Sequence, residues 1–376
     1  MPSACASRRT SPAFQDGIRN SPGWRAGGGA DVQVQDLAAV GPGCRDGAEG
    51  PRSRRRAPCN YNRRETRKPS LNLAALLAAL VAQYAYPPPD RPPLAAFYGR
   101  LCLSTSKRLN AGDRNSGILA YVLLIAVVLV PLGLVAALAA WLHGFLLFAL
   151  NALILYGSLR FLQSTANLGA IERHLRDADA PAAARRLAQW QGEPALSDDP
   201  GATARLAAEH GLREAHHGTF AILLWFLVLP GPLGAVLYPL TQRAARQWEL
   251  GEDPDEREFG WFAGRAFEVL DWVPRRVTAF VFAIVGNFED ALFCWRSQAS
   301  HWLRPGEGIV LASGAGALGV RLGEPVAHGE NVVDRPALGT GEAAGEEALA
   351  SLEGLLWRAL VLWLAAFLLL AALSLS

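Results

Sequence analysis

The feature that most constrains the fold is a run of 25 residues without a charged side chain, 117–141, GILAYVLLIAVVLVPLGLVAALAAW. Each residue of a helix adds about 1.5 Å, so a helix of this length exceeds the roughly 30 Å hydrocarbon core of a bilayer. A buried helix of a soluble protein is seldom both so long and so free of charge. The run therefore predicts a membrane span that is tilted, or kinked at Pro131.

A second apolar segment, near residues 145–162, follows after only His143 and Gly144, which predicts a tight helical hairpin. The connection carries no lysine or arginine, whereas both outer flanks are basic. The flanking charges are Arg100, Lys107, Arg108 and Arg114 on one side and Arg160, Arg173 and Arg176 on the other. Because positive charge marks the cytoplasmic side, the tip of the hairpin is expected outside the cell. A further span is predicted near 355–375, with Arg358 at its rim.

Two other apolar segments leave alternatives open. Residues 71–86 are short and stop at a triple proline, which fits a short span or an interfacial helix. Residues 219–240 are interrupted by Pro230-Gly231-Pro232, which fits a kinked span or a re-entrant hairpin. A hairpin would place the polar segments 163–218 and 241–353 both in the cytoplasm, and the arginines of the second segment favour it.

The composition agrees with a chain that meets lipid. Only 19% of the residues are charged and the mean hydropathy is +0.15, whereas an average soluble domain has about 25% charged residues. We therefore predict an all-α, multi-pass integral membrane helical protein with cytoplasmic helical segments. The net charge of +2 does not indicate nucleic-acid binding. The five irregularly spaced cysteines predict neither a disulfide framework nor a zinc site.

Residues 1–70 differ from the rest of the chain. They are rich in Arg, Gly, Ser and Pro and poor in large apolar residues, which predicts a disordered extension. No apolar stretch typical of a signal peptide lies near the start. Since Met1 is the only methionine, a true start near Leu71 is an alternative. The predicted membrane domain is 71–376.

Two polar patterns are candidates for a binding site. Residues 314–319 match GxGxxG, but no alternation of strands and helices surrounds them, so a dinucleotide site is rejected. A phosphate-contacting loop or a packed small-residue helix remains. His210, Glu214 and His217 would share one helical face, which fits either a metal site or a polar cluster before a membrane entry.

The region 271–296 mixes arginines, acids and tryptophans. Arg275 and Arg276 suit a carboxylate or phosphate, because a guanidinium binds either in bidentate fashion. Acidic residues in this region suit Mg²⁺, which prefers oxygen ligands. Trp272 and Trp295 equally suit interfacial anchors, with the arginines reaching to lipid headgroups.

Three stretches carry a resemblance to a known superfamily. They are the region with Phe259-Gly260, Arg265, Glu268, Asp271, Pro274 and Arg276, the segment AGALGVRLG at 315–323, and the membrane entry WFLVLPGPLGAVLY that ends at Tyr238. Together they resemble the CobD/CbiB family of cobalamin-biosynthesis membrane proteins and its relative AmpE. The resemblance spans roughly residues 71–376 in organisation and is close over 219–323.

The resemblance implies a bacterial inner-membrane protein of the adenosylcobinamide-phosphate synthase type. Such a protein would join aminopropanol to a corrinoid carboxylate by an amide ligation that uses ATP and Mg²⁺. The residues implied as catalytic are Glu209, Glu268, Asp271 and Arg276. Those implied for substrate or phosphate binding are Arg265, Arg296, Gly316, Gly319 and Arg321. The implied metal ligands are Glu289 and Asp290.

Some positions depart from the family pattern. The family's NTLDSM is replaced by QRAARQ at 242–247, with Ala245 at the acidic position, and Phe267 replaces the first of two paired acids. Because catalytic residues act as a unit, these changes support a second hypothesis. In it, the chain is a non-catalytic, AmpE-like membrane regulator linked to cell-wall and β-lactamase signalling, with membrane-protein partners and no cofactor.

The hypotheses predict different arrangements. A ligase requires 209–217, 268–276 and 287–296 to converge on one pocket, whereas a regulator would place the arginines and tryptophans along the membrane edge. A transporter is a weaker third hypothesis, because no span carries an ionisable residue at its centre and no inverted repeat is visible.

Overall fold

The structure is a computed structural model that describes residues 69–89, 93–193, 199–249, 254–328, 331–333 and 335–373. The predicted extension 1–70 lies outside these residues, apart from the first two residues of helix α1.

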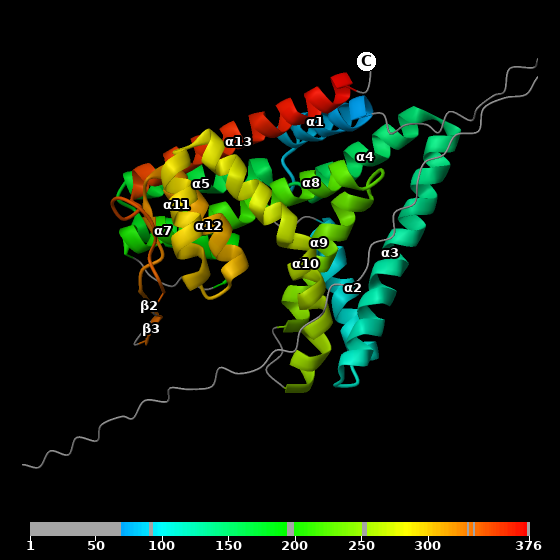
Figure 1. Ribbon diagram of the computed structural model, residues 1–376, viewed down its shortest axis with the longest axis horizontal. Helices are drawn as coiled ribbons and strands as arrows, with labels where there is room; N and C mark the ends of the chain where they lie inside the picture. The colour runs from blue at the N-terminus through cyan, green and yellow to red at the C-terminus, as the bar shows by residue number, and fades with distance from the viewer. Residues whose placement is uncertain are drawn as a thin grey trace, which may run out of the picture. The chain divides into compact units, whose positions relative to one another are not determined.

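The described chain is almost entirely helical, as predicted (Figure 1). The first helices are α1 (Pro69–Ala85), α2 (Pro93–Leu109), α3 (Arg114–Leu142), α4 (Gly144–Ser158), α5 (Phe161–Arg176) and α6 (Ala180–Gln191). They are followed by α7 (Pro200–Ala215), a π-helical turn (His216–Phe220), α8 (Ala221–Val228), α9 (Leu233–Glu249) and α10 (Pro254–Val285). The last helices are α11 (Phe288–Gln298), a 3₁₀ turn (Ala299–His301), α12 (Pro305–Leu318) and α13 (Glu346–Leu373).

Among the described residues, three helical segments are long and apolar enough to cross a membrane. They are α3, the continuous pair α4–α5 from Gly144 to Arg176, and α13. Their positions agree with the spans predicted near 117–141, 145–162 and 355–375. Helix α1 is apolar but too short for this class. On length and composition, the chain is a membrane protein.

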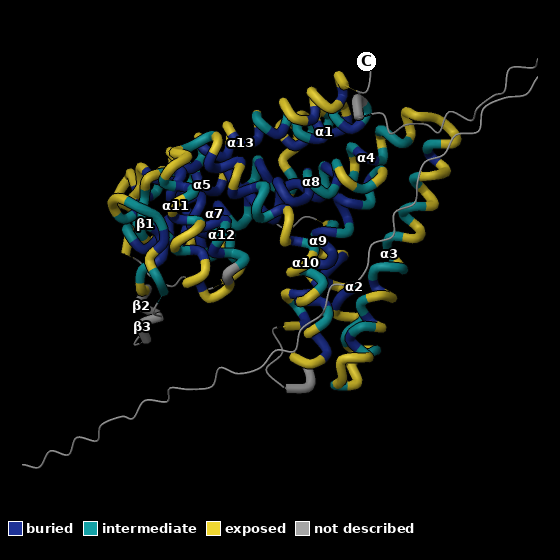
Figure 2. Tube along the Cα trace, viewed as in Figure 1, coloured by how far each residue is buried: buried dark blue, intermediate teal, exposed yellow. Residues whose placement is uncertain are grey.

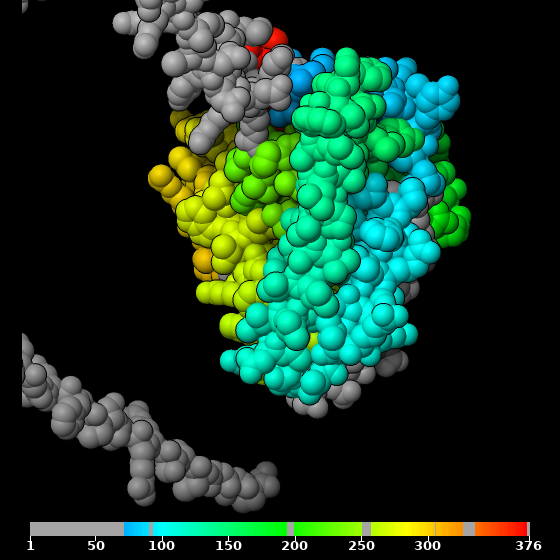
Figure 3. Space-filling model, turned by 90° about the vertical axis from the view of Figure 1, so that its right-hand side faces the viewer, coloured from blue at the N-terminus to red at the C-terminus, as the bar shows by residue number. Residues whose placement is uncertain are grey.

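Helix α3 shows most plainly why lipid is expected. The Asp113 side chain caps its N-terminus, and His143 both ends α3 and caps α4 by accepting from the Phe145 amide at 3.1 Å. Only 6% of its most apolar window is buried by the protein. Figure 2 shows the helix exposed along most of its length, and Figure 3 shows it lying across one face of the molecule. Such a large apolar surface requires a covering, and a bilayer provides it.

The apolar segment 219–240 reverses direction at Pro230-Gly231-Pro232. Helix α8 ends at Val228 and α9 begins at Leu233, with Gly231 in the left-handed region at φ +60°. The two helices lie so close that a Cβ at Gly234 would stand 2.0 Å from the Trp225 carbonyl oxygen. This is the reversal that the hairpin interpretation predicts, and it brings the start of α8 beside α9.

The polar segments follow the prediction with one addition. Residues 163–218 form α5 to α7, where Asp179 and Asp199 cap the N-termini of α6 and α7. In the second segment, α10 contains Pro274 and bends along its length (Figure 1), as expected when a proline removes a helical hydrogen bond. The part of this segment that follows α12 also forms two short antiparallel pairs. They are β1 (Arg321–Leu322) with β4 (Leu338–Gly339), and β2 (Val326–His328) with β3 (Asn331–Val333).

The described residues bury two hydrophobic cores. The larger core joins α1 and α4 to α13 and includes Phe220, Phe226 and Phe282. The smaller core joins α2, α3, α9 and α10 and includes Trp248 and Phe259. Helices α9 and α10 contribute to both cores, so polar side chains on these two helices lie where the cores meet.

Candidate functional site

A buried hydrogen-bond network begins at the π-helical turn. In this turn the backbone takes one extra residue per turn, a distortion often found at functional sites. His216 is 1% exposed, and its Nε2 donates to Asp271 Oδ1 of α10 at 2.9 Å. Its Nδ1 lies 2.9 Å from the Thr278 hydroxyl, one and a half to two turns further along α10. Both imidazole nitrogens of His216 are therefore committed to α10.

The same carboxylate oxygen is linked to the neighbouring imidazole through a tyrosine. The Tyr238 hydroxyl on α9 donates to Asp271 Oδ1 at 2.7 Å and lies 2.8 Å from His217 Nδ1. Since the hydroxyl has one proton and gives it to Asp271, His217 Nδ1 must be the protonated nitrogen that donates to Tyr238. The Nε2 of His217 is then left with a free lone pair.

The pKa values of Asp271 and His217 agree with these hydrogen-bonding roles. Burial alone would raise the pKa of Asp271, but the charge and hydrogen bond of His216 and the Tyr238 hydroxyl outweigh it and lower the pKa to about 2. Burial, together with the neighbouring His216, holds the pKa of His217 well below 6.5. At neutral pH, Asp271 is thus an acceptor and His217 a neutral base.

His217 separates two cavities. The first, here called the basic cavity, has a volume of about 90 Å³ and contains the guanidinium groups of Arg160, Arg243 and Arg246 with a single carboxylate, Glu214. Its other walls are Leu94, Ala95, Tyr98, Gly157, Ser158, Gly218, Ile222, Pro239 and Gln242. Arg160 Nη1 pairs with Glu214 at 2.9 Å. Two positive charges therefore remain without a neutralising carboxylate in this cavity.

The second cavity, here called the acidic cavity, has a volume of about 240 Å³ on the other side of His217. It is lined by Glu249, Glu268, Asp271, Glu307, Arg275, Arg304, Gly264, Phe267, Leu303 and Gly306 besides His217. Burial raises the pKa of Glu249, and the nearby Glu268 carboxylate adds to the rise against the opposing charge of Arg304. Four carboxylates face two guanidiniums, so this side of His217 favours cations.

Two groups of residues at this site differ in how well they suit the implied Mg²⁺. Among the described residues, one group of three metal-ligating side chains is close enough to share an ion, namely His216, His217 and Asp271, whose ligand atoms lie within 4.8 Å of one another. Their hydrogen bonds already use the ligand atoms of His216 and Asp271, and two imidazoles are poor ligands for Mg²⁺. Mg²⁺ often takes one or two carboxylates and completes its shell with water and phosphate oxygens. Glu249 and Glu268 fit that pattern.

Two of the sequence-predicted catalytic residues meet at this site. Asp271 is its buried carboxylate, and Glu268 lines the acidic cavity, where its side chain also pairs with Arg265 at 2.7 Å. Arg275, which the sequence singled out beside Arg276, holds Asp271 in place: its Nε donates to the Asp271 carbonyl at 3.0 Å and lies 3.5 Å from the carboxylate.

The other two predicted catalytic residues lie elsewhere. Glu209 is 1% exposed and accepts from Arg335 at 2.7 Å and from the Gly323 amide at 3.0 Å, so it ties α7 to the segment after β1. Arg276 lies along its own helix, with its guanidinium 4.0 Å from the centre of the Trp272 ring. Neither residue lines the two cavities.

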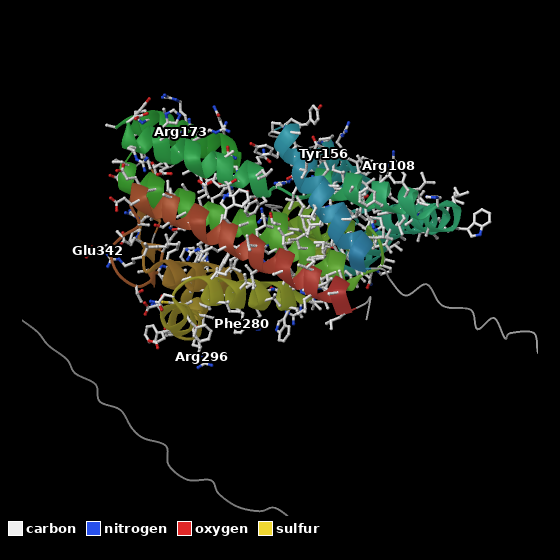
Figure 4. All side chains as sticks on the ribbon, turned by 90° about the horizontal axis from the view of Figure 1, so that it is seen from above. Arg108, Tyr156, Arg173, Phe280, Arg296 and Glu342 are labelled. Atoms are coloured by element: carbon white, nitrogen blue, oxygen red, sulfur yellow. The ribbon has the colours of Figure 1, made fainter. Side chains whose placement is uncertain are left out.

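The predicted metal and phosphate residues near α11 and α12 also lie outside the cavities. Glu289 and Asp290 stand in the first turn of α11, where the helix dipole favours them, and Glu289 shares a surface groove with Arg296. Figure 4 shows Arg296 at the outer edge of the molecule. Thus the residues 287–296 do not join 214–217 and 268–275.

The glycine motif has a packing role. Gly314 and Gly316 lie inside α12, the packed small-residue helix that was one of the two alternatives. A Cβ at Gly316 would lie 2.5 Å from the Asp290 carbonyl oxygen of α11. Gly319 ends α12 in the left-handed conformation at φ +67°, and Arg321 pairs with Glu324 at 2.8 Å.

Several site residues escaped the sequence-based prediction. Tyr98, Ser158 and Thr278 carry no motif signal, because each is brought in from a different helix. Tyr238 ends one of the stretches that carry the resemblance, but no role was predicted for it. Arg243 and Arg246 did carry a signal: they stand in the QRAARQ segment that departs from the family pattern. The departure suggests a loss of polar groups, whereas in the structure Arg243 and Arg246 of this segment line the basic cavity.

Comparison with known proteins identifies the family. The family model described as CobD/Cbib protein matches residues 73–355. The cobalamin biosynthesis protein CobD of Stutzerimonas stutzeri (strain A1501) is 35% identical over 296 residues, which cover 77% of this chain and 93% of that protein. The protein of the same name from Chromobacterium violaceum is 34% identical over 52% of this chain and 62% of its own length. That of Mycobacterium tuberculosis (strain H37Rv) is 32% identical over 48% of this chain and 59% of its own length.

No solved structure matches the chain. The AmpE-like interpretation of the altered positions gains no support from the comparisons, which find CobD proteins. The matched region runs from α1 into α13 and contains every residue of the network and of both cavities. The chain belongs to the CobD/Cbib family.

Proposed function

We propose that this protein acts in cobalamin biosynthesis as an amide ligase of the adenosylcobinamide-phosphate synthase type. In this role it joins aminopropanol to a corrinoid carboxylate at the site around His217. The family membership supports the pathway, and one structural observation supports the chemistry: His217, whose Nδ1 bonds Tyr238, lines both a basic and an acidic cavity. The protein would act as a multi-pass protein of the bacterial inner membrane.

The chemistry requires a base beside the attacking amine. An amine is largely protonated at neutral pH and becomes a nucleophile only after it loses a proton. His217 Nε2 accepts that proton, and the chain Tyr238–Asp271–His216 fixes the imidazole with Nε2 directed away from the network. Asp271 stabilises the imidazolium that results, because its negative charge lies one hydrogen-bonded hydroxyl away from the ring.

The two cavities divide the reactants by charge. The acidic cavity receives the ammonium group of aminopropanol, with Glu268 and Glu249 as its counter-charges. The basic cavity receives the anionic groups of the activated carboxylate. When bound, ATP and Mg²⁺ would supply the phosphoryl group that activates the carboxylate. The two positive charges on Arg243 and Arg246 stabilise the negative charge that develops at that end of the site.

The corrinoid must remain largely outside these cavities. Volumes of about 90 and 240 Å³ suffice for the side arm and the small amine, but not for a corrin ring. A lipid-facing or cytoplasmic surface around the cavity mouths would carry the ring. The enzyme therefore recognises the carboxylate arm in detail and the macrocycle only at its edge.

Genetic complementation tests this proposal. A bacterial strain that lacks its own CobD/CbiB is supplied with this chain under conditions that require the ligation. The wild-type chain and Arg173→Gln, which alters an exposed α5 side chain that lines neither cavity, should restore growth. His217→Gln and Asp271→Asn should not, although Western blots show them in the membrane. Absence of rescue by a wild-type chain that is present in the membrane would overturn the proposal.

A further inference from the structure

The basic cavity contains two hydroxyl groups that have no hydrogen-bond partner within the described part of the chain. They belong to Tyr98 of α2 and Ser158 at the end of α4, whose residues are 4% and 7% exposed. Buried hydroxyls are nearly always paired, because an unpaired one loses its bonds to water and gains nothing in return. Both residues line the same cavity, so a ligand there lies near both hydroxyls.

The cavity also carries unbalanced charge. Arg160 pairs with Glu214, whose pKa is lowered because Arg160, His210 and Arg246 together outweigh the effect of its burial. Arg243 and Arg246 are both exposed to solvent, and none of the described carboxylates forms an ion pair with either. Each guanidinium offers several N–H donors and no acceptor. The cavity therefore suits an acceptor-rich ligand with two negative charges.

The helical backbone is broken beside the basic cavity, as it is at many ligand sites of membrane proteins. Helix α4 ends at Ser158 and α5 starts at Phe161, and the Arg160 amide donates to the Gly218 carbonyl of the π-helical turn at 3.0 Å. An irregular backbone within an apolar segment is tolerated where it lines a cavity. Gly218 leaves room there, since a Cβ on it would lie 3.1 Å from the Glu214 carboxylate.

We infer that the basic cavity is a binding site for a phosphate group. Arg243 and Arg246 neutralise its two charges, and the hydroxyls of Tyr98 and Ser158 donate to its oxygens. The inference deepens the proposed function by naming the ligand class of the same site, on which it rests for the origin of the phosphate. The group is either the terminal phosphate of a nucleotide or a free or small-molecule phosphate.

Charge, donors and size separate phosphate from other anions. A carboxylate has one negative charge and would leave one guanidinium unbalanced, whereas a phosphate dianion matches both. Four tetrahedral oxygens can accept from two guanidiniums and two hydroxyls on different helices, which a planar carboxylate reaches less well. A cavity of about 90 Å³ is well below the roughly 300–1,000 Å³ of pockets that enclose drug-sized ligands, which suits a group of the size of phosphate.

Calorimetric titration of the full chain in lipid nanodiscs tests the inference without turnover. The probes are inorganic phosphate, ATP and, as a carboxylate control, acetate. Arg243→Gln and Arg246→Gln should each weaken phosphate binding about 10- to 100-fold, the usual effect of losing a hydrogen bond to a charged group. Tyr98→Phe and Ser158→Ala, which remove one hydroxyl each with little change of shape, should weaken it about 2- to 10-fold. Arg173→Gln, at an exposed arginine of α5 outside both cavities, should have no effect.

The probes also identify the source of the phosphate. If the variants weaken ATP to the same extent, the group belongs to the nucleotide; if only inorganic phosphate is affected, it is a separate ligand. Both results support the site. Acetate binding as tight as phosphate, equal phosphate binding by all variants, or no saturable phosphate binding by the wild type would overturn it. Failure of genetic complementation together with phosphate binding that the variants lose would overturn the proposed function and leave the phosphate site intact.

Discussion

The Tyr238 hydroxyl donates to Asp271 Oδ1 at 2.7 Å, and this one bond joins the two halves of the site. Tyr238 lies just after the chain reversal at Pro230-Gly231-Pro232, and Asp271 lies on α10 beside the bend at Pro274. Through Tyr238 the carboxylate orients His217, and directly it orients His216. The positions of α9 and α10 therefore determine the orientation of the His217 imidazole.

Replacement of this hydroxyl should disturb both the fold and the activity. In Tyr238→Phe, His217 Nδ1 loses its acceptor and Asp271 loses a donor, both in a buried site. We expect a loss of about 1–3 kcal/mol in the free energy of unfolding and a failure to complement. Tyr121→Phe is a matched control, because the Tyr121 hydroxyl lies 3.1 Å from the Thr241 hydroxyl outside the site. Thermal unfolding in nanodiscs measures the first effect, and equal behaviour of the two variants would contradict it.

Glu209 should prove important for stability. Its buried carboxylate pairs with Arg335 and accepts from the Gly323 amide, so Glu209→Ala leaves a guanidinium without its partner. Loss of one partner of a buried ion pair costs about 3–5 kcal/mol. We expect a lower Tm and less folded protein, with activity per folded molecule retained. A normal Tm with no activity would instead make Glu209 catalytic.

Acid should destabilise the protein through its buried histidines. Burial lowers the pKa of His210 to about 4, and that of His217 lies well below 6.5. Below pH 6.5 the unfolded chain takes up protons at these positions while the folded chain does not, so stability falls as the pH falls from 6.5 towards 4. Each such histidine contributes a slope of about 1.4 kcal/mol per pH unit.

His210 provides a variant for this test, because it packs edge-on against Trp190 and does not line either cavity. His210→Phe keeps an aromatic ring and removes one titrating group. The free energy of unfolding, followed by denaturant titration between pH 4 and 7, should depend less steeply on pH in this variant, by the slope of one proton. An unchanged slope would show that His210 titrates normally in the folded protein.

Replacement of two glycines by alanine should change the stability of the protein in opposite directions. At Gly316 a Cβ would lie 2.5 Å from a backbone oxygen of α11, so Gly316→Ala should force the helices apart and cost about 1–3 kcal/mol. At Gly354, inside α13, nothing lies within 4 Å of the same position. Gly354→Ala should therefore be neutral or stabilise the helix by up to about 1 kcal/mol. Equal effects on Tm would contradict the close contact of α11 and α12.

Local sequence features predict the elements of this fold well. The absence of charge over 117–141 is sufficient to predict α3, and the Pro-Gly-Pro step is sufficient to predict the break between α8 and α9. Both depend on residues that are neighbours in the chain, where helix length and proline geometry decide the outcome.

The site depends on contacts between residues that are distant in the chain. Tyr98, Ser158 and Arg243 come from α2, α4 and α9, and nothing in their local sequence shows that these helices meet. Glu209 has the composition of a catalytic acid, yet its partner Arg335 lies 126 residues away. The role of an acid is set by that partner, so its sequence context alone could not distinguish a structural pair from a reactive group.

Direct measurement of the ligation tests the central claim. The purified chain in nanodiscs is given a corrinoid carboxylate, aminopropanol, ATP and Mg²⁺, and amide formation is followed by mass spectrometry. The wild-type chain should form the amide, and His217→Gln should slow it about 10²- to 10⁴-fold, the usual contribution of a general base. A His217→Gln variant that forms the amide at the wild-type rate would show that His217 is not the base and would contradict this account of the site.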